Sequence, residues 1–340
     1  MAANLYVHFP FCRSRCSYCA LYSRAGSTPA SRSDYVARLA GALDKAADRF
    51  GAKPLSTIYF GGGSPALCDL RPLAPTLRRL CGEETEFTVE LHPLDVCADK
   101  MEELGSIGVN RISMGVQSLD DRVLAHMGRG YGADDAARAF ELVKARFDNA
   151  GIDLIVGYPG DGGTDFSSLG GWGLSHCSVY SLQNERGLRD VPDDDSVLDR
   201  IHAVAGFLKT IGLERYEISN YALPGRECRH NLAVWRGEDY YGIGEGAYGR
   251  AGLFRTRSWW GEPLEESASV ERVDEAGDDK ERTLFRLRTR EGLDASRHPE
   301  WLPVLDGFVG QGLLRKQSGP VYLLTERGTE VCDSILTDLV

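Results

Sequence analysis

The sequence predicts an α/β fold, namely an incomplete parallel (β/α)6-type barrel followed by a small C-terminal helical, winged-helix-like domain. Short β-rich runs alternate with helical stretches from the N-terminus to about residue 220. Such alternation is typical of parallel strands joined by right-handed crossovers. Polar and cysteine residues recur directly after the β-rich runs, where parallel α/β folds carry their functional groups. From about residue 270 the pattern changes to short helices and a hairpin-like stretch over residues 313–325.

Seven β-rich runs are the expected strands. They cover residues 6–9, 57–60, 87–91, 111–115, 152–156, 177–182 and 215–219. Helical periodicity lies between them, most clearly over residues 34–50 and 133–145. Ser33 precedes the first of these helices and is its candidate N-cap.

Changes in composition along the chain predict three segments. Residues 1–220 carry the alternating pattern and form the barrel. Residues 221–269 are rich in glycine and aromatic residues, so we expect them to connect the two domains mainly through loops. Residues 270–340 form the small C-terminal domain.

The charge and cysteine content of the chain limit its partners and location. The 340 residues have a formal net charge of -11, and acidic residues outnumber basic ones in residues 270–340. This balance argues against a nucleic-acid partner. Nine cysteines, three of them clustered, favour metal ligands in a reducing compartment over disulfides. Since no apolar run approaches the ~20 residues that cross a bilayer, and no signal-peptide pattern is present, we expect a cytoplasmic protein without a transmembrane segment.

Three cysteines after the first expected strand indicate a metal cluster. Cys12, Cys16 and Cys19 have the spacing Cys-x3-Cys-x2-Cys, which can hold three irons of a cubane 4Fe-4S cluster from one loop. Electron carriers normally use four cysteines for each cluster, so here the fourth iron is left for another ligand. A structural zinc site is the alternative, but it needs four ligands and His8 is the nearby candidate for the fourth. We therefore expect a cluster that binds a cofactor.

Glycine and polar residues follow the next expected strands. Gly61-Gly62-Gly63-Ser64-Pro65 lets the backbone approach a ligand closely, although a tight strand-to-helix turn would use the same residues. Glu90, Gln117 and Asp153 lie in or just after the third, fourth and fifth strands, where they can hydrogen-bond a ligand. One such residue is usually a cap or a satisfied core group. Several at the same edge of a barrel predict a binding site.

The order of these motifs resembles the radical S-adenosylmethionine (SAM) superfamily and, within it, the oxygen-independent coproporphyrinogen III oxidase-like family in its HemW heme chaperone branch. The matching motifs run along nearly the whole chain: residues 6–12, the glycine turn, Glu90-x2-Pro93, residues 108–118, Asp153-Leu154-Ile155 and His230-Asn231-x3-Trp235. The resemblance implies a 4Fe-4S cluster on the three cysteines. It also implies SAM contacts from Tyr6, Gly62, Gly63, Ser64 and Glu90, further cofactor-binding positions at Gln117, Arg129 and Asp153, and an aromatic position at Tyr18 beside the same pocket.

Two features separate the chaperone branch from the oxidase. The oxidase has a further cysteine two residues past the third cluster ligand, whereas this chain has Leu21 there. No cluster of basic residues suggests a pocket for a tetracarboxylate porphyrinogen. The resemblance therefore implies a protein that binds heme as cargo and transfers it to client hemoproteins of respiration. The alternatives are a radical SAM oxidative decarboxylase acting on coproporphyrinogen III or a related tetrapyrrole in porphyrin biosynthesis, and a scaffold that keeps its cluster for stability. Peripheral contact with a membrane stays open.

The chaperone branch associates a His-Asn-x2-Tyr-Trp motif with heme, and here residues 230–235 read His-Asn-Leu-Ala-Val-Trp. Imidazole is a common axial ligand of heme iron, so His230 is the candidate heme ligand, with Trp235 against the macrocycle and Cys228 as a second candidate. A structural role for His230, bonded to backbone, is the alternative. Valine replaces the tyrosine of the motif. Glu245 and Tyr248 also replace residues usual in relatives, so the sequence is that of a divergent member.

Overall fold

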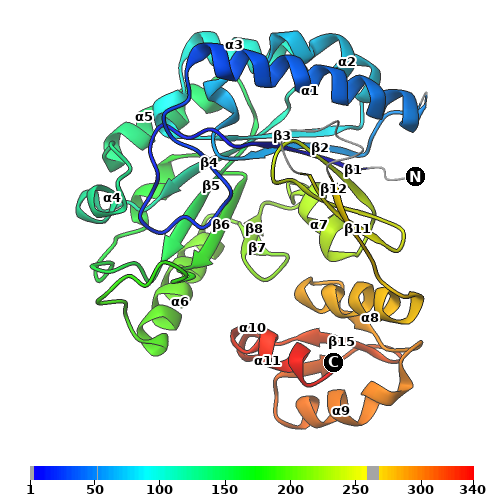
Figure 1. Ribbon diagram of the computed structural model, residues 1–340. Coiled ribbons are helices and arrows are strands. Elements are labelled where there is room, and N and C mark those ends of the chain that lie inside the picture. The colour runs from blue at the N-terminus through cyan, green and yellow to red at the C-terminus, as the bar shows by residue number, and fades with distance from the viewer. Residues whose placement is uncertain (1–3, 52, 259–267) are drawn as a thin grey trace.

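The computed structural model describes residues 4–51, 53–258 and 268–340, and a curved sheet dominates it (Figure 1). Twelve described strands form this sheet in the order β12-β11-β10-β9-β1-β2-β3-β4-β5-β6-β8-β7. Their bounds are β1 Asn4–Phe9, β2 Thr57–Gly62, β3 Glu86–Leu91, β4 Arg111–Gln117, β5 Asn149–Val156, β6 His176–Ser181, β7 Glu214–Arg215, β8 Asn220–Ala222, β9 Tyr240–Ile243, β10 Tyr248–Ala251, β11 Phe254–Ser258 and β12 Ala268–Arg272. Adjacent strands from β9 through β1 to β6 run parallel, so the predicted α/β class and incomplete parallel barrel are confirmed.

Helices connect the parallel strands and cover the outer face of the sheet (Figure 1). The α-helices are α1 Pro29–Phe50, α2 Ala74–Leu80, α3 Ala98–Ser106, α4 Asp121–Met127, α5 Ala133–Lys144, α6 Asp194–Thr210, α7 Arg229–Trp235, α8 Glu275–Phe285, α9 Leu302–Gly310, α10 Glu326–Glu330 and α11 Cys332–Thr337. The predicted helix over residues 133–145 is confirmed by α5. The predicted start of the first helix is wrong, because Thr28 rather than Ser33 caps α1 through a capping box with Ser31, and Pro29 suits the first turn.

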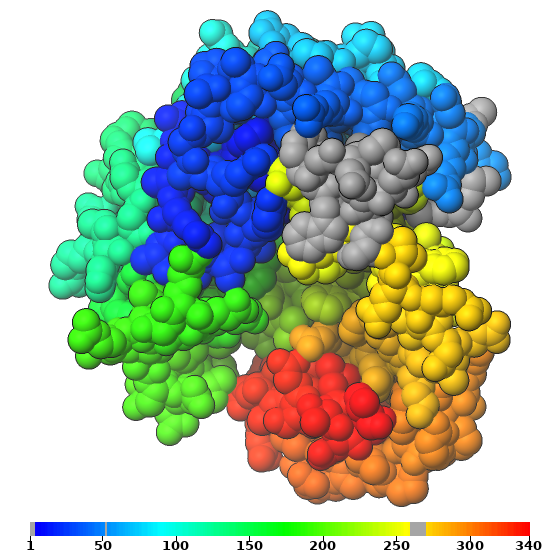
Figure 2. All heavy atoms as spheres, viewed as in Figure 1, coloured from blue at the N-terminus to red at the C-terminus, as the bar shows by residue number. Residues whose placement is uncertain are grey.

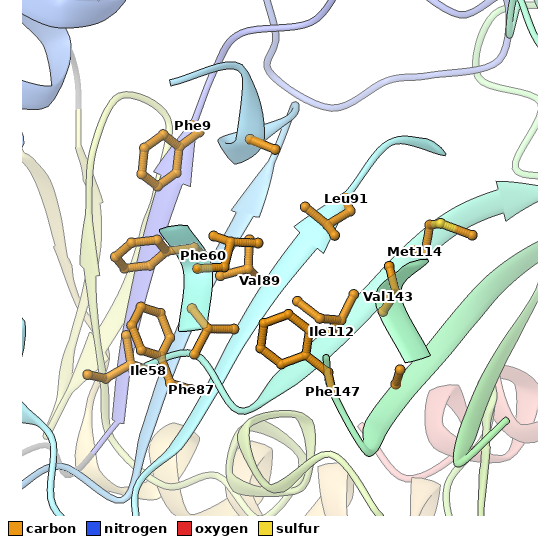
Figure 3. Close-up of a cluster of buried hydrophobic side chains, with 14 of the residues drawn as sticks. Phe9, Ile58, Phe60, Phe87, Val89, Leu91, Ile112, Met114, Val143 and Phe147 are labelled. Carbon is orange, nitrogen blue, oxygen red and sulfur yellow. The ribbon is translucent and has the colours of Figure 1, made fainter. Parts of the chain in front are cut away.

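Alternate residues of the parallel strands face opposite sides of the sheet, and this divides the apolar core from a polar interior. Large apolar side chains point outward and pack beneath the helices, as Figure 3 shows for Phe60, Phe87 and Ile112. The residues between them, such as Thr57, Glu86, Glu90 and Arg111, face the inside of the barrel. Many of these inward polar side chains are themselves buried. The inside of the barrel is therefore the polar side of the sheet, where a hydrophilic cofactor can be recognised.

The seventh predicted strand, over residues 215–219, is wrong. Instead, β7 ends at Arg215 and the chain turns back at once into β8, which pairs antiparallel with β6. The Tyr216 amide donates to the Asn220 carbonyl at 3.0 Å and closes this turn. The parallel run thus ends at β6, and a short hairpin closes that edge of the sheet.

Residues 221–269 were expected to form mainly loops, but their described part adds strands to the other edge of the sheet. β9 pairs in parallel with β1, and β10, β11 and β12 continue from it as an antiparallel meander. α7 lies within this stretch, on the inner side of the curved sheet (Figure 1). The glycines permit close strand packing here. A Cβ atom on Gly242 would lie 2.1 Å from the Tyr248 carbonyl oxygen, and one on Gly249 would lie 2.8 Å from the Gly242 amide.

The C-terminal residues form a lobe with its own apolar core. In Figure 2 this lobe, coloured orange to red, lies below the N-terminal residues. It contains α8 to α11 and a three-stranded sheet of β13 Leu293–Asp294, β14 Leu314–Lys316 and β15 Val321–Leu324. Leu287, Trp301, Leu305 and Tyr322 fill its core. The predicted small domain and its hairpin over residues 313–325 are confirmed, since β14 and β15 pair antiparallel.

Candidate cluster and cofactor site

The three cysteines lie in the loop that joins β1 to α1, at the carboxyl end of β1. The Cys12 amide donates to the Arg24 carbonyl at 2.9 Å and the Cys19 amide donates to the Cys16 carbonyl at 3.3 Å, so the loop folds back on itself. All three thiols are partly exposed and free of disulfides. Burial raises the pKa of Cys12 and Cys19, and the neighbouring thiols raise it further. These thiols therefore keep their protons unless a positively charged partner such as iron stabilises the thiolates.

The donor set suits an iron-sulfur cluster. Three thiolates on one loop are the ligands that such clusters use, and soft sulfur donors select iron-sulfur or zinc centres over hard cations. A site for a single metal ion is a different arrangement. Among the residues that the structure describes, the three cysteines included, no three His, Cys, Asp or Glu side chains converge as the ligands of one metal ion would.

Arg129 brings a buried positive charge to the cysteine loop. Its side chain is 8% exposed and donates to the Cys16 sulfur at 3.4 Å and to the Gly115 carbonyl at 2.6 Å. The Tyr18 hydroxyl lies 3.5 Å from the same guanidinium, and the Tyr131 hydroxyl lies 2.9 Å from its Nε. An arginine stays ionised in any protein environment, so this one can balance the negative charge of thiolates and of an anionic ligand.

The glycine turn after β2 is packed tightly against the end of β1. Gly62 has φ +104°, and a Cβ atom there would lie 2.4 Å from the His8 ring. A Cβ atom on Gly63 would lie 2.4 Å from the Phe11 carbonyl oxygen. The Gly63 amide donates to Phe9 and the Ser64 amide to Phe11, both at 2.7 Å. In this structure the glycines therefore fix the strand that leads into the cysteine loop, and these two amides are already used within the protein.

Glu90 and Asp153 lie on the polar inner face of the sheet. Glu90 accepts hydrogen bonds from the Tyr59 hydroxyl at 2.8 Å and the Gly62 amide at 3.0 Å. Burial, with a contribution from Asp153, raises the pKa of Glu90 to about 7. Asp153 accepts from the Ser113 hydroxyl at 3.0 Å, and burial raises its pKa as well. Burial thus disfavours the negative charge of both carboxyl groups. A cationic group of a ligand placed between them would stabilise their ionised forms.

Tyr6, Tyr18 and Gln117 complete the set of predicted cofactor residues. The Tyr6 hydroxyl hydrogen-bonds His8 Nδ1 at 2.9 Å inside the barrel. Tyr18, in the cysteine loop, packs edge-on against the Tyr158 ring. Gln117 ends β4 at a register shift and has φ +71°, a left-handed conformation that non-glycine residues rarely adopt. Such backbone strain at the carboxyl end of a strand is typical of functional sites.

His230 lies at the opposite end of the barrel from the cysteines. Its Nδ1 hydrogen-bonds the Thr57 hydroxyl at 2.7 Å and its amide donates to Glu86 at 3.1 Å. Thr57 and Glu86 are the first residues of β2 and β3, whereas the cysteine loop follows the end of β1. The histidine is 5% exposed, and burial lowers its pKa to about 3. The structure therefore separates His230 from the cysteine loop, although its ring lies 6.4 Å from that of Tyr6 and 5.1 Å from that of Tyr59, between ring centroids.

The neighbours of His230 in the heme-associated motif are also engaged within the protein. The Trp235 ring contacts Phe285 edge-on, with ring centroids 6.0 Å apart, and the Arg288 guanidinium lies 5.1 Å from the Trp235 ring centroid. Cys228 is fully buried, and its thiol lies 3.7 Å from a Glu86 oxygen. α7 therefore closes the amino end of the barrel and joins it to the C-terminal lobe.

Sequence reasoning missed a carboxylate that ties the cysteine loop to the sheet. Glu245 is 6% exposed and accepts hydrogen bonds from the Tyr22 hydroxyl and, at 2.6 Å, from Arg24. Its amide donates to the Tyr35 hydroxyl at 3.1 Å. The sequence did draw attention to position 245, because an acid replaces the residue usual in relatives there. It gave no indication of the partners of this acid.

Arg111 was missed as well, although it faces the barrel interior with the site residues. It is 1% exposed, and its Nε has no hydrogen-bond partner among the described residues. Its guanidinium lies 3.5 Å from the Thr88 hydroxyl. The alternation of polar and apolar residues along the expected fourth strand could have identified this side chain as inward-facing.

The partial parallel barrel and its three-cysteine loop define a protein of the radical SAM class. Consistent with this, the model of the Radical SAM superfamily matches residues 6–169. The chain is 32% identical to the heme chaperone HemW of Escherichia coli over 98% of its own length and 97% of that protein. It is 30% identical to the heme chaperone HemW of Mycobacterium tuberculosis over 99% of its own length and 94% of that protein. The chain belongs to the HemW heme chaperone family within the radical SAM superfamily.

A solved structure supports the fold. Coproporphyrinogen III oxidase (HemN) from Escherichia coli superimposes with a TM-score of 0.82 at 19% identity, covering 99% of this chain and 89% of that one. The shared architecture extends through the C-terminal lobe. Among the described residues, no helix is long and apolar enough to span a bilayer.

Proposed function

We propose that this chain carries a 4Fe-4S cluster and SAM, binds heme and delivers it to hemoproteins. Membership of the radical SAM superfamily implies the cluster and SAM. The observation that supports the proposal most strongly is the three-cysteine loop, with the buried Arg129 against Cys16, at the carboxyl end of a parallel barrel. The heme chaperone function is proposed from the relatives, which match the chain over nearly its whole length.

Cys12, Cys16 and Cys19 would hold three irons of the cluster. When bound, the cluster supplies an open iron for the amino and carboxylate groups of SAM, and with it the capacity for one-electron chemistry. Arg129 would balance the negative charge of the thiolates and of the SAM carboxylate. Its fixed contact with the Gly115 carbonyl holds the guanidinium in place before any ligand arrives.

The inner face of the sheet would orient the rest of SAM. Glu90, held by Tyr59 and Gly62, can accept a hydrogen bond from an ammonium or hydroxyl group. Tyr6, Tyr18, Gln117 and Asp153 are the further proposed contacts. Gly62, Gly63 and Ser64 would act mainly by fixing the approach of the cysteine loop, because their amides are engaged with Glu90, Phe9 and Phe11.

Leu21 favours heme carriage over oxidative decarboxylation. It stands where the oxidase has a further cysteine, and its side chain is 57% exposed beside the cysteine loop. An exposed leucine cannot supply a thiol to chemistry at this site. The decarboxylase remains the second candidate, to be judged by turnover of coproporphyrinogen III.

His230 is one candidate heme ligand, taken from the sequence motif, and its burial defines what ligation by this residue would require. Heme could reach the ring only if α7 moved away from Thr57 and Glu86, because those residues hold His230 inside the barrel. Replacement of His230 therefore tests ligation and packing together, and the two effects must be measured separately.

Anaerobic reconstitution followed by heme titration tests the proposed function. We expect heme to bind with a shift of its Soret band and to pass to an apo-hemoprotein added afterwards. The His230→Ala variant should be compared at matched stability, measured by urea unfolding. Absence of heme binding, or turnover of coproporphyrinogen III by the wild-type chain, would contradict heme carriage.

A further inference from the structure

An open cleft of about 560 Å³ lies beside the cysteine loop. It is bounded by the cysteine loop, by the first turn of α1, by the turn after β2 and by the start of α3. Cys12 is one of its lining residues, so the cleft reaches the proposed cluster. Its volume falls within the ~300–1,000 Å³ of small-molecule and cofactor sites.

Two arginines give this cleft a positive character in a chain whose formal net charge is -11. Arg13 is exposed, forms an ion pair with Asp95, which also lines the cleft, and donates to the Leu94 carbonyl at 3.1 Å. Lys100 lines the cleft as well and pairs with Glu103. Arg32 donates to the Ser27 carbonyl at 3.0 Å, and no described carboxylate forms an ion pair with it. Both guanidinium groups keep donors for a ligand, since each arginine has five N–H groups. Paired arginines of this kind suit carboxylates.

The remaining walls supply apolar contact and a thiol. Leu67 and Leu94 line the cleft, and Leu94 is 44% exposed. Cys97 also lines it and is the one exposed residue of the nine cysteines, all of which lie within the described residues. It occupies the N-cap position of α3, but its side chain makes no capping hydrogen bond. The thiol is thus free to act as a ligand.

We propose that heme binds in this cleft, with the Cys97 sulfur as an axial iron ligand and Arg13 and Arg32 pairing with the two propionates. On ligation the thiol releases its proton to solvent and sulfur donates an electron pair to the iron, with no change of oxidation state. Leu67 and Leu94 contact the apolar macrocycle. This site rests on the proposed heme chaperone function, and it gives that function a location.

An open cleft suits a cargo that must leave again. His230 is 5% exposed and would require α7 to move before heme could enter or depart. The cleft lies on the surface, so binding and release need no unpacking of the barrel. Its contact with Cys12 would also place the cargo next to the proposed cluster.

Replacement of Cys97 tests the iron ligand. The reconstituted full-length protein is titrated with ferric heme, and the Soret band and the electron paramagnetic resonance spectrum are recorded. We expect the wild type to show a thiolate-ligated spectrum that Cys97→Ser loses, with heme affinity about tenfold weaker. The matched control, Cys81→Ser, lies away from the cleft and should retain the wild-type spectrum.

Replacement of Arg32 tests the carboxylate partner. Arg32→Gln should weaken heme affinity about tenfold, whereas the surface control Arg138→Gln should not change it. Both variants should keep the iron content of the wild type. Wild-type spectra and affinities in Cys97→Ser and Arg32→Gln would overturn the cleft and leave the proposed function intact. Failure of the wild-type chain to bind heme would overturn the proposed function and the cleft with it.

Discussion

Glu90 is the residue whose protonation most directly affects the interior of the barrel. Its folded-state pKa is raised from 4.5 to about 7, chiefly because the carboxyl group is buried. Between pH 4.5 and 7 the unfolded chain loses this proton while the folded protein keeps it. Stability from this group is therefore full below pH 4.5 and falls as the pH rises towards 7, after which it is constant.

Glu90→Gln should remove this pH dependence from the cofactor-free protein. We expect the wild type to lose stability relative to the variant between pH 5 and pH 7.5, because glutamine carries no charge into the buried site. Urea unfolding at the two pH values measures the difference. The exposed control Glu102→Gln should show the same change in unfolding free energy with pH as the wild type. If Glu90→Gln also showed that same change, the raised pKa assigned to Glu90 would be wrong.

The site at residue scale could be predicted only where the sequence carries a spaced motif. The three cysteines fall on one loop as their spacing indicated, and Glu90 and Asp153 lie on the same inner face. The burial of His230 could not be predicted. It depends on Thr57 and Glu86, which begin strands far away in the sequence, and nothing in residues 230–235 specifies them.

At the scale of elements, the cysteine loop is fastened at both ends. Its start continues from β1, and its end is held by Arg24, whose amide donates to the Pro10 carbonyl at 2.5 Å. Glu245, in the turn between β9 and β10, receives the side chains of Tyr22 and Arg24. A single buried carboxylate therefore connects the loop to the turn between β9 and β10.

Glu245→Ala should loosen this loop and destabilise the fold. The change leaves the Tyr22 hydroxyl and the Arg24 guanidinium without their carboxylate, at a cost of about 2 kcal/mol. Urea unfolding measures the loss, and limited proteolysis should cut the variant within residues 12–24 first. The exposed pair of Glu102 and Arg146 offers a control, because Glu102→Ala should change stability by less than about 1 kcal/mol. Equal effects of the two substitutions would show that Glu245 does not hold the loop.

The elements themselves were predictable where local pattern decides them. The first six strands begin and end within a few residues of expectation, because each has a run of β-branched and aromatic residues. The seventh was misjudged, since the turn after Arg215 depends on pairing between β8 and β6. The segment that holds β9 to β11 was expected to form loops because it is rich in glycine. Gly242 and Gly249 instead allow close strand packing, which only the tertiary fold reveals.

At the scale of the whole molecule, an ion-pair network joins the barrel sheet to the C-terminal lobe. Asp278 in α8 pairs with Arg250 at 2.8 Å, Arg255 at 2.6 Å and Arg282 at 2.6 Å. Arg250 and Arg255 belong to β10 and β11. Burial disfavours the charge of Asp278, but the hydrogen bonds from the arginines outweigh it and lower the pKa of this carboxyl group. Its stabilisation is therefore present above pH 4 and is lost as the pH falls below that value.

Asp278→Asn should weaken the attachment of the lobe. Arg250, whose side chain is 4% exposed, would keep its charge without a full partner, and we expect a loss of about 3 kcal/mol. Differential scanning calorimetry should show a lower melting temperature or a separate transition for the lobe. Asp333→Asn removes an exposed partner of Arg288 in the same lobe and serves as the control. A shift no larger than that of the control would contradict the proposed role of the network.

The proposed function depends on Cys12, Cys16 and Cys19 holding a cluster with one iron left for SAM. Electron paramagnetic resonance of the anaerobically reconstituted, reduced protein, recorded before and after addition of SAM, tests this most directly. We expect a 4Fe-4S signal that SAM perturbs and that Cys16→Ser abolishes. A protein that takes up zinc instead, or a cluster signal that SAM leaves unchanged, would contradict it.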